Sequence, residues 1–237
     1  MAFNTIYYVL KMNDISYVII ACYPDRGMKY RGSKSLMEFN GSKLLQHQID
    51  LIISAQKYLK NKYEIILVCD FDKLKIHKAF GNQIKIVSTE DKTNPVFKGC
   101  SEAKYDYLIF MDYGCICNTK LLKSIQKVGP SVVCTKDLGL SHLDVGCITS
   151  ESGLEHMFLG LDHRFTNMFV LSSTEKQAIL QNNRCHRHNL LYFEILNILI
   201  ENNCIISAIN APNNSFYYFN HMRQKNGISK FIKKNSY

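Results

Sequence analysis

Four positively charged side chains follow closely on an apolar segment near the start of the chain. The apolar segment, Val18–Ala21, has the composition of a buried strand. The cations are Arg26, Lys29, Arg31 and Lys34, all within nine residues. Ammonium and guanidinium groups at this density suit phosphate groups. We interpret the segment as a phosphate-binding loop; the alternative is a solvated basic loop without a ligand.

The elements around these cations are those that build ligand sites in open α/β sheets. A helix is predicted over 44–58, where apolar residues recur at helical spacing. A strand that ends in a basic loop and then leads into a helix places the loop at the carboxyl end of the strand. Ligands of such sheets bind at that end. The cations are therefore expected to line a cleft.

The same alternation of strand and helix continues through the first half of the chain. Strands are predicted over 17–22, 64–69, 83–88 and 107–111, with helices over 44–58, 73–80, 94–104 and 119–128. Asn94-Pro95 marks a helix start, because proline is tolerated in the first turn. This order predicts a mostly parallel, doubly wound sheet in a three-layer α/β/α sandwich.

The rhythm changes after Gly129-Pro130, where strands with irregular connections are expected. They are predicted over 131–135, 144–150, 167–171, 205–208 and 216–219, with helices over 174–181, 189–201 and 223–234. We expect one domain over 1–237, made of two halves, 1–130 and 131–237.

Composition narrows the class of protein. The hydrophobic content of 46% suffices for a packed core. The nine cysteines lack the spacings of a zinc module or a disulfide scaffold. Their pattern therefore predicts reduced thiols and a cytoplasmic location. No signal peptide and no membrane span are expected. The net charge of +9 suits anionic partners such as nucleotides and phosphorylated sugars. Nucleic acid is not an expected partner, because no nucleic-acid-binding motif accompanies the charge.

The segment KSLMEFNGSKLLQHQI, from Lys34 to Ile49, resembles a motif of sugar-nucleotide and phosphocholine nucleotidyltransferases. In that motif a lysine precedes an apolar pair, an Asn-Gly turn, a second lysine and a helix. Three further segments, 94–125, 191–200 and 217–232, resemble later parts of the same family. The resemblance implies a nucleotide-diphospho-sugar transferase fold. It also implies that 1–130 is the nucleotide-binding half and 131–237 the acceptor-side half.

The resemblance also implies roles for residues of the phosphate loop. Ala21 and Cys22 would begin the loop, Arg26 would face the leaving pyrophosphate, and Lys34 would contact a phosphate. The remaining implied contacts to the nucleotide are Lys29, Arg31 and Ser101. The loop departs from the family pattern, because Tyr23 and Asp25 stand where the family has glycine.

The resemblance implies a Mg²⁺ site as well. Asp112 would be one ligand, at the end of the fourth strand, and Asn220 the other. Gly114 stands where the family places its acid. The alternative for Asp112 is that it only terminates the strand.

Three functions remain open on these grounds. The first is transfer of a nucleotidyl group from a nucleoside triphosphate to a sugar phosphate or phosphocholine, with Mg²⁺. The second is a catalytically degraded family member that serves as a binding or assembly module, in which case the chain is not an enzyme. The third is a glycosyltransferase that uses a nucleotide sugar.

Overall fold

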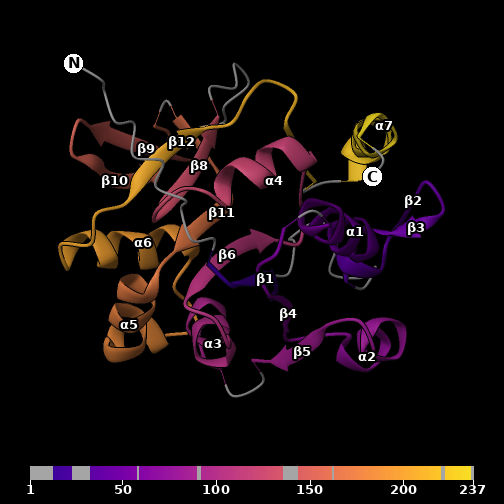
Figure 1. Ribbon diagram of the computed structural model, residues 1–237, viewed down its shortest axis with the longest axis horizontal. Coiled ribbons are helices and arrows are strands. Elements are labelled where there is room, and N and C mark those ends of the chain that lie inside the picture. The colour runs from indigo at the N-terminus through magenta and orange to yellow at the C-terminus, as the bar shows by residue number, and fades with distance from the viewer. Residues whose placement is uncertain are drawn as a thin grey trace, which may run out of the picture.

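A computed structural model describes residues 13–22, 33–57, 59–89, 92–135, 144–161, 163–219 and 222–235. A nine-stranded sheet forms the centre of the molecule (Figure 1). Seven strands follow the order β10-β9-β11-β6-β1-β4-β5, and β8 pairs with β11 and β12. The sheet is mixed: its first half is parallel, and its second half is mainly antiparallel.

The parallel half confirms the four strands predicted from the alternating pattern. They are β1 (Ile15–Ala21), β4 (Tyr63–Cys69), β5 (Lys85–Ser88) and β6 (Tyr107–Asp112). Their apolar runs are nearly continuous because both faces are covered by helices. Ile20 pairs with Asp112, and Ala21 pairs with Cys69, so β1, β4 and β6 end at the same level.

The order of these strands creates a switch point. From β1 the chain moves outward through β4 to β5, and then returns to place β6 on the other side of β1. Connections that leave a sheet in opposite directions open a crevice at the carboxyl ends of the two strands where the order reverses. That position lies between the ends of β1 and β6.

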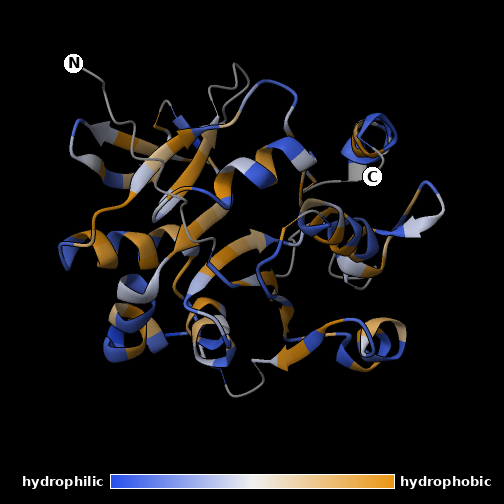
Figure 2. Ribbon diagram, in the orientation of Figure 1, coloured by the Kyte–Doolittle hydropathy of each residue, from blue (hydrophilic) through white to orange (hydrophobic). Residues whose placement is uncertain are grey.

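Helices cover both faces of the sheet, which confirms the predicted three-layer sandwich (Figure 2). One face packs against α1 (Leu44–Gln56), α2 (Lys73–Phe80) and α4 (Thr119–Ile125). The other face packs against α3 (Pro95–Glu102), α5 (Ser173–Gln181) and α6 (Tyr192–Glu201). Each helix turns its apolar residues towards the sheet and its polar residues outward.

The second half departs from the prediction in two strands. The strands are β8 (Ser131–Thr135), β9 (Val145–Ser150), β10 (Gly153–Leu159), β11 (His163–Leu171) and β12 (Ser207–Asn210). Strand β10 was not predicted, because it is an edge strand with a bulge between Leu154 and His156 that breaks the alternation. Strand β11 begins four residues before the predicted Asn167, whose φ of 59° interrupts the strand pattern.

A small satellite core joins the C-terminal segment to the first half. It contains Phe39, Leu44, Ile116, Phe219, Ile228 and Ile232. The elements involved are β2 (Glu38–Phe39), β3 (Ser42–Lys43), β7 (Cys115–Cys117), β13 (Phe216–Tyr218) and α7 (Lys225–Lys234). The predicted Asn-Gly turn is confirmed: Asn40 and Gly41 connect β2 and β3 with positive φ angles of 50° and 83°. Three short 3₁₀ helices complete the described chain, η1 (Lys34–Leu36), η2 (Asn183–His186) and η3 (Met222–Gln224).

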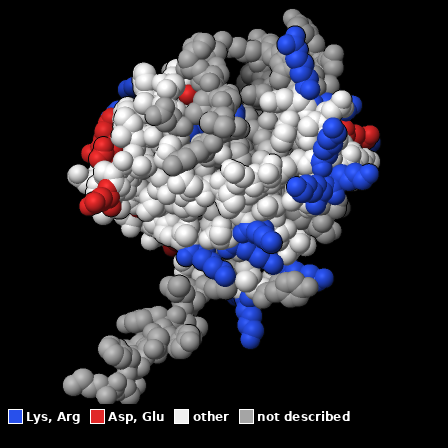
Figure 3. All heavy atoms as spheres, turned by 90° about the horizontal axis from the view of Figure 1, so that it is seen from above, with Lys and Arg blue, Asp and Glu red and all other residues white. Residues whose placement is uncertain are grey.

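Charge is distributed unevenly over the surface (Figure 3). On the face seen from above, acidic side chains gather at the left, over the β9–β10 hairpin, which carries the exposed Glu151 and Glu155. Basic side chains gather at the centre and right of this face. No helix within the described ranges combines the length and the apolar character needed to cross a membrane.

Candidate functional site

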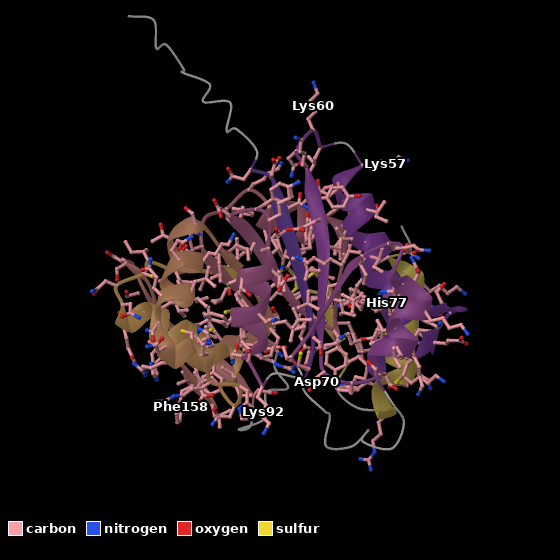
Figure 4. All side chains as sticks on the ribbon, turned by 90° about the horizontal axis from the view of Figure 1, so that it is seen from below. Lys57, Lys60, Asp70, His77, Lys92 and Phe158 are labelled. Atoms are coloured by element: carbon pink, nitrogen blue, oxygen red, sulfur yellow. The ribbon has the colours of Figure 1, made fainter. Side chains whose placement is uncertain are left out.

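The carboxyl ends of the parallel strands form one edge of the molecule (Figure 4). Asp70, at the end of β4, lies on this edge near Lys92, whereas Lys57 and Lys60 lie at the opposite edge. The topological switch point is on the edge with Asp70. Lys34 and Asp112, which come from segments 78 residues apart in the sequence, meet at this point.

Lys34 begins η1 and is almost fully buried, with 2% of its surface exposed. Its ammonium donates a hydrogen bond to the carbonyl oxygen of Phe219 at 3.1 Å. The nitrogen also lies 5.2 Å from the ring centroid of Tyr113 and 5.5 Å from that of Phe219. Burial lowers the pKa of Lys34 to about 8, and the charge of Asp112 opposes this shift. The group therefore keeps its proton at pH 7.

Asp112 ends β6 and is 4% exposed. Its Oδ1 accepts a hydrogen bond from the backbone N–H of Gly114 at 2.8 Å, and its Oδ2 accepts one from the hydroxyl of Tyr192 at 2.9 Å. The hydroxyl of Tyr218 is a third donor. Burial raises the pKa of Asp112, while these three donors and the charge of Lys34 oppose the shift.

The turn after Asp112 is held from two sides. The amide of Gln48, on α1, donates to the carbonyl oxygens of Asp112 at 3.0 Å and of Cys115 at 2.8 Å. On the other side, the backbone of Gly114 lies close to that of Phe219. A Cβ atom at Gly114 would lie 2.5 Å from the carbonyl oxygen of Phe219, so the position admits no larger side chain without a backbone shift.

The loop after β4 adds two acids that the sequence did not single out. Asp72 adopts a left-handed conformation with φ of 53°, and its Oδ2 accepts a hydrogen bond from the backbone N–H of Ser33 at 2.7 Å. This contact fixes the start of η1 and hence the position of Lys34. Asp70 lies nearer the switch point, and partial burial raises its pKa to about 6.

Ala21 and Cys22 lie at the switch point, since they end and follow β1. Ala21 is 1% exposed and Cys22 is 5% exposed. The thiol of Cys22 donates to the carbonyl oxygen of Val68 at 3.3 Å, so it faces the sheet. Burial raises the pKa of this thiol.

The structure does not bring Ser101 together with Lys34 and Asp112. Ser101 lies in the last turn of α3, and its hydroxyl donates to the carbonyl oxygen of Lys98 in the same helix at 2.9 Å. Because α3 leads from the carboxyl end of β5 back to the start of β6, its last turn lies at the opposite edge. The remaining predicted site residues, Arg26, Lys29, Arg31 and Asn220, lie outside the described residues.

A divalent metal ion does not fit the described residues around Asp112. A carboxylate has about four lone-pair positions, and three protein donors already use three of them. Gly114, at the position of the family's acid, has no room for a carboxylate. Within the described ranges, no group of three His, Cys, Asp or Glu residues is placed to hold a metal.

Sequence reasoning missed the residues that surround Asp112. Gln48 was part of the resemblance motif but had no assigned role, and Tyr113, Tyr192 and Tyr218 had none either. Tyr192 lies 80 residues from Asp112 in the sequence, and a single tyrosine at a helix start carries no signal of such a contact. Tyr113 could have been found from its place directly after the strand.

Comparisons with known proteins identify the fold. No family model matches the sequence, and no curated protein matches it. An inositol-1-phosphate CTP transferase from T. maritima superposes with a TM-score of 0.72 and 10% identity, over 94% of this chain and 98% of that chain. A Bacillus anthracis protein assigned as a glucose-1-phosphate thymidylyltransferase, solved with sucrose, superposes with a TM-score of 0.70 and 10% identity, over 91% of this chain and 95% of that chain.

Both similar structures are of sugar-phosphate nucleotidyltransferase type, and both superpose over nearly their whole length. The resemblance seen in the Lys34–Ile49 motif is therefore confirmed at the level of the fold. The chain has the nucleotide-diphospho-sugar transferase fold that it shares with these nucleotidyltransferases.

Proposed function

We propose that this protein transfers a nucleotidyl group from a nucleoside triphosphate to a phosphorylated small molecule, such as a sugar phosphate or phosphocholine. The observation that carries the proposal is the placement of a buried lysine at the switch point of a nucleotidyltransferase fold. A fold hosts many functions, so the argument depends on the site. A cation at the carboxyl ends of β1 and β6 suits a polyphosphate.

In the proposed reaction, an oxygen of the acceptor phosphate attacks the α-phosphorus in line, and pyrophosphate leaves. The protein contributes position and charge. Lys34 would hold positive charge beside the phosphates, and the backbone after β1 would approach them. Asp112 would position the site through Tyr192 and Tyr218, which tie α6 and β13 to the end of β6.

Other parts of the proposal rest on the sequence. Arg26, Lys29 and Arg31 would bind further phosphate oxygens, and the halves 1–130 and 131–237 would bind nucleotide and acceptor. A cytoplasmic location remains a prediction. Mg²⁺ held by Asp112 and Asn220, which the resemblance implies, is not part of this proposal, because the described residues around Asp112 do not fit a divalent ion.

The test measures nucleotide binding first and turnover second. The protein is titrated calorimetrically with CTP, UTP, GTP, ATP and dTTP in the presence of Mg²⁺. The nucleotide that binds is then incubated with glucose 1-phosphate, inositol 1-phosphate or phosphocholine, and pyrophosphate release is followed. Binding together with pyrophosphate release that depends on the acceptor supports the proposal. No heat with any of the five triphosphates contradicts it.

The second candidate is a binding or assembly module. Two observations favour it: Lys34 is 2% exposed, and Asp112 already accepts hydrogen bonds from three protein donors. A ligand would have to displace protein groups to reach either side chain. This candidate predicts no heat with any of the five triphosphates, whereas binding of an intact nucleotide sugar without pyrophosphate release would favour the glycosyltransferase. The glycosyltransferase alternative loses support at Gly114, where the second acid of an Asp-x-Asp pair has no room.

A further inference from the structure

A nucleotide site at the switch point needs a positive charge near the phosphates, from either a metal ion or a side chain. The surroundings of Asp112 leave little room for a metal ion. The acid that would hold a metal is engaged by the N–H of Gly114 and by the hydroxyls of Tyr192 and Tyr218. Three donors and an exposed fraction of 4% leave it little capacity for a cation from solution. To bind there, an ion would have to expel at least one tyrosine hydroxyl.

The neighbouring position cannot restore a metal site. Carboxylates two residues apart would need a side chain at Gly114, whose Cβ would lie 2.5 Å from the carbonyl oxygen of Phe219. That carbonyl is the acceptor for the ammonium of Lys34 at 3.1 Å. The carbonyl oxygen of Phe219 therefore both excludes a side chain at Gly114 and accepts the hydrogen bond from Lys34. Gly114, where the family has an acid, thus lies next to the ammonium of Lys34.

Lys34 is held in place by contacts within the protein. Lys34 is anchored by Ser33, whose N–H donates to Asp72, and its ammonium lies over the rings of Tyr113 and Phe219. Its charge acts on Asp112 and opposes the rise in the pKa of that acid that burial causes. A metal ion would have to be coordinated directly by Asp112, whereas the point charge of a buried ammonium acts on phosphate groups through the protein groups that enclose it.

We infer that the ammonium of Lys34 takes the electrostatic place of a divalent metal at Asp112, so that a nucleoside triphosphate binds without a metal ion held by Asp112. The inference rests on the proposed function, since it concerns the same nucleotide site. Asp112 is then a positioning residue, which holds α6 and β13 at the end of β6 and balances the charge of Lys34.

The test compares binding with and without divalent metal. CTP is titrated calorimetrically at pH 7 in excess EDTA and, separately, in excess Mg²⁺, and the other four triphosphates are run in the same way. The expected dissociation constants agree within about threefold, which corresponds to less than about 1 kcal/mol. Lys34→Met is expected to weaken binding roughly 10- to 100-fold in both buffers, because the positive charge beside the phosphates is lost.

A matched control replaces a lysine at the opposite edge. Lys60 is exposed and far from the switch point, so Lys60→Met should leave both constants unchanged (Figure 4). Thermal melting of each variant shows that it is folded. If Lys34→Met does not fold, the comparison of EDTA with Mg²⁺ in the natural protein still decides the matter.

A second readout uses the metal alone. Mn²⁺ is titrated into the protein without nucleotide, and the free ion is counted by electron paramagnetic resonance. We expect the natural protein and the Asp112→Asn variant to leave the same amount of Mn²⁺ free, because Asp112 binds none. A Mn²⁺ site that this variant abolishes overturns the inference, and so does triphosphate binding that occurs only with Mg²⁺; both leave the proposed function standing. No triphosphate binding in either buffer overturns the proposed function and the inference together.

Discussion

At the scale of single residues, burial outweighs attraction between Lys34 and Asp112. The two opposite charges act on each other, yet the pKa of Lys34 is lowered to about 8 and the pKa of Asp112 is raised. Mutual attraction alone would shift both pKa values the other way. Buried pairs of this kind add little to stability, because the cost of removing two charges from water is large. We therefore expect Lys34 and Asp112 to matter more for the arrangement of the site than for the stability of the protein.

The lowered pKa of Lys34 predicts a pH dependence of nucleotide binding. Below pH 8 the ammonium is charged and attracts phosphate; as the pH rises through 8 it loses its proton, so CTP binding should weaken about tenfold by pH 9. Calorimetric titrations at half-unit steps from pH 6.5 to pH 9.5 measure the effect. Lys34→Met should bind weakly and show no such decline. A decline that persists in this variant would assign it to another group.

The hydroxyl of Tyr192 is expected to stabilise the protein. Tyr192→Phe removes one donor from the buried carboxylate of Asp112 and should lower the free energy of unfolding by about 1–3 kcal/mol. Urea denaturation at pH 7 measures the change. Tyr63→Phe is the matched control: its side chain is 39% exposed, and the change should be below about 0.5 kcal/mol. Equal stability of Tyr192→Phe and the natural protein would show that the other donors suffice.

At the scale of elements, asparagine side chains begin two helices that flank the site. Asn118 accepts a hydrogen bond from the N–H of Leu121 at the start of α4. Asn94 accepts one from Val96 at the start of α3, and its amide also donates to the carbonyl oxygens of Arg187 and Leu190. Asn94 therefore joins the two halves of the chain, whereas the side chain of Asn118 caps a helix only.

The two caps make a matched pair for mutation. Asn118→Ala should cost about 1 kcal/mol, the usual value for a lost cap. Asn94→Ala should cost about 2–4 kcal/mol, because it also leaves two carbonyl oxygens of the second half without their donor at a fully buried position. Urea denaturation of both variants measures the difference. Equal losses would mean that the two carbonyl contacts contribute nothing.

At the scale of the whole molecule, buried thiols govern the response to alkali. Burial raises the pKa of several cysteines, among them Cys22, Cys100, Cys115, Cys117 and Cys185, the last two to about 12 and about 11. In the unfolded chain these thiols lose their protons near pH 8.5–9. Above that pH the folded state binds more protons, so stability falls as the pH rises.

The expected loss is large. At pH 10 each of these thiols disfavours the folded state by roughly 1–2 kcal/mol, and together by about 7 kcal/mol, comparable with the whole stability of a typical domain. Urea denaturation under reducing conditions at pH 7, 9 and 10 should show the midpoint falling steeply above pH 9. Recovery of the pH 7 midpoint after return from pH 10 is the control for chemical damage. A midpoint unchanged at pH 10 would contradict the prediction.

Local patterns in the sequence were enough to predict most of the first half. The four parallel strands are apolar because both of their faces are covered, and α2 matches its prediction over Lys73–Phe80. The Asn-Gly turn demands positive φ angles that few residues accept, so it could be predicted locally. Irregular edges were harder: the bulge in β10 and the left-handed Asn167 in β11 break the period that reveals a strand.

The sequence by itself determined the fold class and the presence of Lys34 and Asp112 at the carboxyl edge, because the succession of strands and helices, and the position of each loop after its strand, follow from local periodicity. Only the tertiary structure decided what these residues touch. Phe219, Tyr192 and Tyr218 reach them across 80 to 185 residues of chain, through contacts that leave no periodic mark. Desolvation depends on the same distant neighbours, and so the protonation of the site is a property of the packed molecule.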